Sequence, residues 1–141
     1  MRTYGFKLYR AGRNKKLHKQ IDIACNVYND CIALHRRYYR MFGKSLNIYA
    51  LQKHLAKLKQ TKRFSYWNKL GSQAVQNVTE RIDRACKLFF GNLKRCVRTA
   101  PPSFKAKHKY KSFTLKQKAG CKLLPNNELL IGKQKYKYHK S

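Results

Sequence analysis

Hydrophobic residues recur with two different periods along this chain, and the changes of period divide it into three parts. Residues 3–8 alternate polar and apolar side chains, which predicts a strand with one buried face. From Leu17 to Phe42 apolar residues recur every three or four positions, which predicts an amphipathic helix that ends near Gly43. Alternation returns only near the C-terminus, so we expect a strand, then helices, then strands again.

Two more helices and a short connecting element are expected in the middle of the chain. The second helix follows Asn47, which is a candidate N-cap together with Ser45. The third begins at Ser72, a suitable N-cap residue, and carries a wide apolar face. Between them, residues 64–70 hold large apolar side chains that predict a short helical or turn element with Trp67 in the core.

The C-terminal part is predicted to consist of strands and turns. Pro101 and Pro102 end the helical part because proline cannot continue a helix. Apolar positions at residues 110–115 indicate the next strand, Pro-Asn-Asn at 125–127 predicts a hairpin turn, and the alternating segment 134–140 predicts a further strand.

The three helices therefore interrupt a set of strands. A lone N-terminal strand needs partners, and the only other predicted strands lie at the far end of the chain. We expect an α+β fold in which a helical bundle at residues 13–98 is inserted into a small β-barrel. Residues 1–12 would form the first strand of that barrel, and residues 99–141 would supply the others.

Charge is the strongest signal in the composition. The chain holds 34 Lys and Arg against 5 Asp and Glu, which gives a net charge of +29. Self-repulsion on this scale disfavours a compact state unless a polyanion neutralises it, so we expect a nucleic acid as the partner. An anionic membrane is the other available polyanion, but no apolar run approaches the roughly 20 residues of a membrane span.

Cysteines and carboxylates limit the chemistry that can be expected. Five cysteines, without a secretory signal or a CxxC pair, predict reduced thiols in a cytoplasmic protein, which we expect to be nucleoid-associated. No phosphate-binding loop or hydrolase motif occurs, and the five carboxylates are scattered along the chain. We therefore expect a protein that is not an enzyme and uses neither a metal ion nor another cofactor.

Basic and neutral stretches have different uses in binding a nucleic acid. Residues 35–40 (HRRYYR) and 105–111 (KAKHKYK) interleave cations, which neutralise phosphates, with rings that can stack on unpaired bases. Residues 70–79 carry no charge at all. Their polar side chains can hydrogen-bond to base edges, although a helix start packed on its neighbours is the simpler alternative.

Four ordered segments resemble the N-terminal half of TnpB, a family of RNA-guided DNA endonucleases long described as transposases with a helix-turn-helix. The segments are YN at 28–29, GKSLNIYALQKHLAKLK at 43–59, SQAVQNVTERIDRACKLFF at 72–90 and PPSFKAKHKYKSFTL at 101–115. The resemblance implies a wedge-like β-barrel that is interrupted by a helical recognition lobe. The RuvC-type nuclease domain of the family would follow the barrel, so we expect a truncated relative without nuclease activity of its own.

The resemblance also implies partners and contact residues. The partners would be guide RNA from the transposon end, double-stranded DNA with a short transposon-adjacent motif and, in a split effector, a separately encoded nuclease domain. Phosphate contacts are implied for Lys105, Lys107, Lys109 and Lys111. The other candidate nucleic-acid-binding residues are Tyr49, Gln52, Ser72, Gln73, Gln76, Asn77, Ser112 and Thr114.

Two other functions stay open at this point. One is a stand-alone structural RNA-binding protein that uses charge and stacking without recognising a sequence. The other is a repressor that places a helix-turn-helix in the major groove of DNA.

Overall fold

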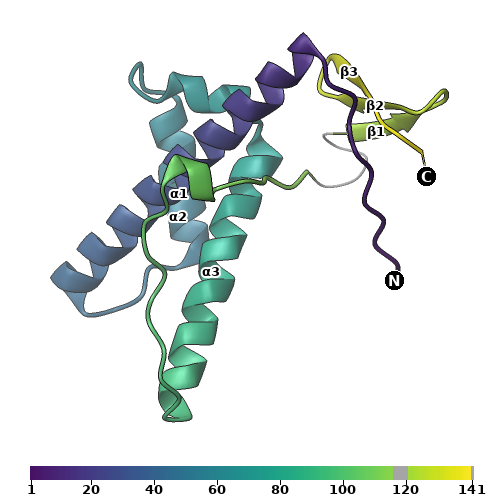
Figure 1. The fold of residues 1–141 in the computed structure, drawn as a ribbon. Coiled ribbons are helices and arrows are strands. Elements are labelled where there is room, and N and C mark those ends of the chain that lie inside the picture. The colour runs from purple at the N-terminus through teal and green to yellow at the C-terminus, as the bar shows by residue number, and fades with distance from the viewer. Residues whose placement is uncertain (116–120, 141) are drawn as a thin grey trace.

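The computed structural model describes residues 1–115 and 121–140, and these form an α+β fold, as the sequence predicts (Figure 1). The helical part has three α-helices, α1 (Lys15–Phe42), α2 (Ile48–Lys59) and α3 (Ser72–Lys94). Short 3₁₀ turns are η1 (Gly12–Asn14), η2 (Ser65–Lys69) and η3 (Lys107–Lys109). The strands are β1 (Cys121–Leu124), β2 (Glu128–Ile131) and β3 (Gln134–Lys137).

The helix ends show which local signals in the sequence were decisive. Helix α1 stops at Gly43, whose φ of 65° is left-handed and whose N–H donates to the Tyr39 carbonyl. Asn47 caps α2, because its side chain accepts a hydrogen bond of 2.8 Å from the backbone N–H of Tyr49. Helix α3 begins at Ser72, as predicted, but the N-cap assignment of Ser72 is wrong. Gly71, with a φ of 92°, holds the cap position, and Ser72 is the first helical residue.

The core lies where α1 and α2 pack against α3, and η2 closes one end of it. Trp67 of η2 is completely buried, as predicted, and so are Cys31 of α1 and Ile82 of α3. Every residue of this core is uncharged. The apolar stripes of the three amphipathic helices therefore account for the helical half of the molecule.

The strands form an antiparallel sheet with the order β1-β2-β3. The predicted hairpin between β1 and β2 is confirmed, since Leu124 pairs with Glu128 across a turn in which Asn126 and Asn127 adopt φ angles of 64° and 57°. Asparagine tolerates this left-handed backbone better than most residues, which explains the sequence of the turn.

The N-terminal segment meets the C-terminal strands, but not as a full strand. Leu8 forms an isolated antiparallel bridge with Tyr138, and the Tyr9 N–H donates to the Lys137 carbonyl at 2.9 Å. Arg13 also donates to the Lys135 carbonyl, which ties the sheet to the start of the helical part. The described residues thus form an open three-stranded sheet with one additional bridge. The closed barrel and the limits of its domain stay predictions.

The strand predicted over residues 110–115 is not present. Residues 101–115 run as irregular backbone, interrupted only by η3, across the front of α1 and α3 (Figure 1). The apolar positions that suggested a strand, Tyr110, Phe113 and Leu115, pack on the helical core instead. Side chains of the helices, rather than a neighbouring strand, bind the backbone of this segment.

Burial of the thiols generates a prediction about reactivity and pH. Burial raises the pKa of Cys25, and it raises the pKa of Cys31 to about 12, whereas Cys96 is exposed. Native protein treated with iodoacetamide near pH 8 should be alkylated at Cys96 long before Cys25 or Cys31, as mass spectrometry would show. Equal alkylation rates at Cys31 and Cys96 in the native protein would contradict the packing. Denatured protein, in which both thiols are accessible, is the control.

The same shift has a defined effect on stability. A thiol whose pKa is raised in the folded state ionises first in the unfolded state as the pH increases. The free energy of unfolding should therefore fall as the pH rises from about 9, the ordinary thiol value, towards about 12. Urea unfolding of Cys31→Ala beside the native sequence would show a weaker dependence over that range.

Candidate nucleic-acid interface

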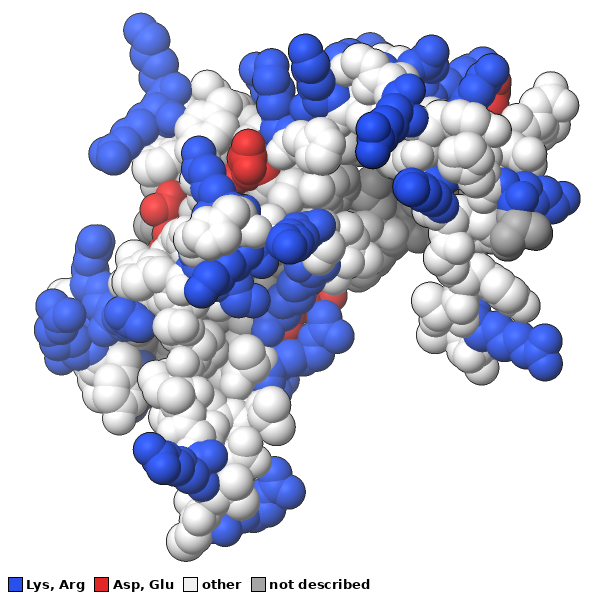
Figure 2. Space-filling view, viewed as in Figure 1, with Lys and Arg blue, Asp and Glu red and all other residues white. Residues whose placement is uncertain are grey.

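Lysine and arginine side chains cover much of the visible surface and far outnumber the acidic side chains. Figure 2 shows them over both the helical part and the sheet, with Asp and Glu visible at a few points only. The acids do little to neutralise them within the described residues, where Asp83 forms an ion pair of 2.9 Å with Lys87. The positive field is therefore available to an external polyanion, and the question is which surface would give specificity.

Residues 101–115, which we call the docked segment, carry four of the predicted phosphate ligands. Asn29 of α1 fixes this segment through both ends of its carboxamide. Its Nδ2 donates to the Lys105 carbonyl at 2.9 Å, and its Oδ1 accepts from the Lys105 N–H at 3.0 Å. A side chain thus supplies the pair of hydrogen bonds that a neighbouring strand would otherwise give.

The neighbouring tyrosine adds a second attachment. The Tyr28 hydroxyl donates to the Ser103 carbonyl at 3.0 Å, and its ring lies 5.5 Å from that of Tyr110. Burial raises the pKa of both hydroxyls above the ordinary tyrosine value. The Lys105 ammonium lies 5.2 Å from the Tyr28 ring centroid, a cation–π contact that directs this lysine back over the segment.

Arg81 of α3 anchors the other end of the docked segment. Its guanidinium donates to the Ser112 carbonyl at 3.1 Å and to the Thr114 hydroxyl at 2.8 Å. A longer contact of 3.4 Å reaches the Tyr110 hydroxyl. The segment is therefore held at two places, on α1 and on α3, while Lys107, Lys109 and Lys111 between them are exposed.

The start of α2 and the docked segment contact α3 on two different faces of the helix. Gln52 of α2 donates to the Thr79 hydroxyl at 3.0 Å, which places the start of α2 along one edge. The Arg81–Thr114 hydrogen bond places the docked segment along the other edge. By the helical period, Ser72 and Gln76 lie nearer to the Thr79 face of α3 than to the Arg81 face, and both are exposed. We call Gln52, Ser72, Gln76 and Thr114 the polar strip.

The remaining predicted residues divide into exposed and inward-facing ones. Tyr49, at the start of α2, is 77% exposed, and Ser112 is exposed with its carbonyl bound by Arg81. Asn77 is only 8% exposed, and its Oδ1 and the Oε1 of Gln73 are buried without a partner among the described residues. Gln73 and Asn77 were predicted from the neutral composition of residues 70–79, which does not show which side chains turn inward.

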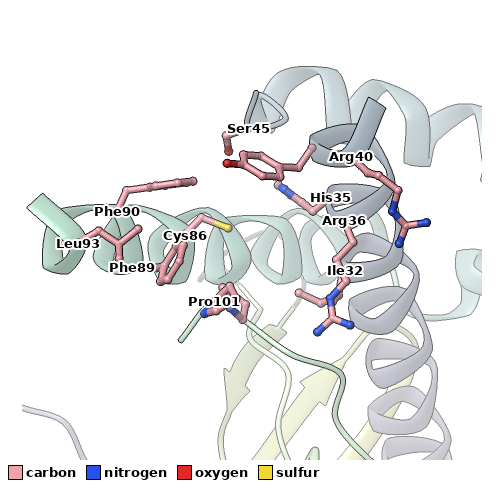
Figure 3. A pocket seen from close by; sticks show the side chains of 12 residues that line it. Ile32, His35, Arg36, Arg40, Ser45, Cys86, Phe89, Phe90, Leu93 and Pro101 are labelled. Atoms are coloured by element: carbon pink, nitrogen blue, oxygen red, sulfur yellow. The ribbon is translucent and has the colours of Figure 1, made fainter. Parts of the chain in front are cut away.

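An apolar groove of about 700 Å³ is the feature that sequence reasoning missed (Figure 3). It opens where the C-terminal halves of α1 and α3 diverge, and Phe90, Leu93 and Tyr39 extend their apolar stripes into it. Part of the HRRYYR cluster lines it, and the guanidinium of Arg36 lies 4.6 Å from the ring centroid of Phe104. The sequence does carry a signal for this groove, because the apolar stripes of α1 and α3 continue beyond the point where the two helices separate.

His35 of α1 lies in the same groove. Its buried Nε2 has no hydrogen-bond partner in the described part of the chain. Burial lowers the pKa of this imidazole, which favours its neutral form.

Residues 1–115 and 121–140 hold no group of three or more His, Cys, Asp or Glu side chains arranged to bind a metal ion. Among the same residues, each helix is too short or too polar to cross a membrane. No protein-family model matches the sequence, and no curated protein matches it either.

The bidentate contact of Asn29 gives a testable consequence. Asn29→Ala should lower the free energy of unfolding by about 1–2 kcal/mol, because two hydrogen bonds are lost, and should speed tryptic cleavage at Lys105–Lys111. Urea denaturation and timed proteolysis would measure the two effects. Asn26→Ala is the control, since the Asn26 side chain has no hydrogen bond to the described residues. Equal behaviour of the two variants would contradict the assigned attachment.

Proposed function

We propose that this chain is a nucleic-acid-binding module that binds an RNA scaffold and recognises a short motif in double-stranded DNA, without nuclease activity of its own. The observation that carries the proposal is that α3 presents neutral side chains at its start and also holds the docked segment. Ser72 and Gln76 are neutral and exposed, and Arg81 of the same helix holds Thr114 of the segment that carries exposed lysines. Such an arrangement suits base recognition between phosphate contacts.

The chemistry of the two surfaces supports a division of roles. Lysines of the docked segment would bind phosphates and set the register, but phosphate contacts carry no sequence information. The Gln76 amide can donate and accept at once, as recognition of an adenine edge requires, and the start of α3 favours the approach of an anionic backbone. Hydrogen bonds already occupy Gln52 and Thr114, so we assign them to the support of Gln76 and Ser72.

The resemblance to TnpB agrees with this assignment. The family motifs YN, SQAVQ and SFTL coincide with Asn29, Gln76 and Thr114, which attach or border the two surfaces. In this proposal the helical part serves as the recognition lobe, and the open sheet with its N-terminal bridge belongs to a wedge-like barrel. Guide RNA, duplex DNA and a separately encoded nuclease domain are the proposed partners.

The alternatives make different use of the same surfaces. A repressor of the helix-turn-helix type needs a turn of roughly three or four residues between its helices, whereas residues 60–71 separate α2 from α3 here. A structural RNA-binding protein would need only charge and stacking, which Lys107 and Arg36 with Phe104 could supply. The variants described next separate that function from motif recognition.

Neutralising two exposed lysines tests the role of the docked segment. Lys107→Gln with Lys109→Gln should weaken RNA binding and lower the slope of log K against log salt by about 1.4, since each phosphate contact contributes about 0.7 on a single strand. Fluorescence anisotropy at several salt concentrations would measure the slope. The matched control is Lys122→Gln with Lys133→Gln on the sheet, and equal slopes for both pairs would contradict this role.

Removing one amide tests the polar strip. Gln76→Ala should leave the affinity for RNA unchanged but reduce the preference for the selected DNA motif by about tenfold, since one good amide–base pair gives about 1–3 kcal/mol of discrimination. Selection from a randomised duplex library, with RNA present, measures the preference. Gln73→Ala, whose amide oxygen is buried, is the control. A native protein that selects no motif would favour the structural RNA-binding function.

A further inference from the structure

A second cavity, lined in part by Asn29, differs in chemistry from the apolar groove. It measures about 330 Å³ and is lined by side chains of α1, of η2 and of the turn before η2. The residues are Asn26, Asn29, Asp30, Arg63, Phe64 and Tyr66. A carboxylate beside two carboxamides and two aromatic rings is unusual in a chain with so few acids.

Two of these polar side chains are available to a ligand. Asn26 and Asp30 are four residues apart in α1, so they lie one turn from each other on the same face. Neither side chain has a hydrogen bond or ion pair with the described residues, whereas Asn29 is occupied by Lys105. Burial raises the pKa of the Asp30 carboxyl group and the nearby Arg63 lowers it, and the residue as a whole is exposed to a ligand.

The aromatic wall of the cavity is held in place by the core. The Phe64 ring lies 4.6 Å from the ring of Trp67, which is fully buried, and the Arg63 guanidinium lies 5.2 Å from the Phe64 centroid. Tyr66 contacts the same tryptophan edge-on at 6.3 Å and is 37% exposed. A flat ligand can therefore stack on Tyr66 without rearrangement of the core, with a cation close by for a phosphate.

The hydrogen-bonding groups fit one nucleobase better than the others. Guanine presents two adjacent donors, N1–H and the N2 amino group, next to the O6 acceptor. The two oxygens of Asp30 can accept from both donors, while the Asn26 amide can donate to O6. Adenine offers an acceptor at N1, which the carboxylate would repel, and uracil and cytosine each present a single donor on this edge.

We propose that this cavity binds one unpaired guanine, with its base edge against Asp30 and Asn26, its ring against Tyr66 and an adjacent phosphate near Arg63. The edge in question is occupied in a duplex, so the ligand is a guanine in a loop, a bulge or a single strand. This inference rests on the proposed nucleic-acid-binding function and adds a site for RNA apart from the polar strip.

Oligonucleotides that differ in one base test the site. The probes are fluorescent oligouridines of about ten nucleotides, with a central guanine, adenine or inosine, or with uridine throughout. The native chain should bind the guanine probe about tenfold more tightly than the adenine probe, because hydrogen bonds to a charged carboxylate are stronger than those between neutral groups. Inosine, which lacks the N2 amino group, should fall between them.

Substitutions then locate the preference. Asp30→Asn should abolish the difference between guanine and adenine while binding oligouridine at least as well, because it removes a negative charge. Asp22→Asn makes the same charge change at an exposed position of α1 outside the cavity and should keep the preference. Tyr66→Ala should weaken binding of the guanine probe more than that of oligouridine.

The outcomes separate the two proposals. If all probes bind equally to the native chain, or if Asp30→Asn keeps the guanine preference, the cavity is not a guanine site although the chain still binds RNA. If no probe binds at any salt concentration, the proposed function fails, and this inference fails with it.

Discussion

Repulsion between like charges is the constraint on which this structure depends. With 34 basic and 5 acidic residues, ion pairs cannot hold the chain together, and cohesion must come from apolar burial and from neutral hydrogen bonds. The core accordingly contains no charged residue, and its largest buried side chain is Trp67. The cations are left at the surface, where their mutual repulsion favours the approach of a polyanion.

The docked segment shows how a basic stretch is kept in place under this constraint. Asn29, Tyr28 and Arg81 bind its backbone and hydroxyl groups, so attachment does not require a carboxylate for each lysine. The lysines between the attachment points remain available to phosphates. The fold thus determines where the positive charge is presented. In the proposals above, the lysines bind phosphates, and the polar strip and the cavity at Asp30 recognise bases.

The helices were predictable from the sequence because each has an apolar stripe with a helical period, and the hairpin was predictable from its asparagine turn. The course of residues 101–115 was not, since Tyr110, Phe113 and Leu115 alternate too irregularly to distinguish a strand from a segment that packs on helices. For the candidate site, the sequence predicts which types of residue take part but not which way their side chains point. That Gln73 and Asn77 turn inward, and that α1 and α3 diverge into a groove, depends on how the helices cross.

Amide hydrogen exchange of the full chain, free and saturated with an RNA hairpin that has single-stranded flanks, tests the central claim most directly. Irregular backbone exchanges readily, so a bound nucleic acid should slow exchange in the docked segment around η3 more than in β1–β3. Protection at residues 105–112 is the expected result. Protection confined to the sheet, or none anywhere at saturating RNA, would contradict it.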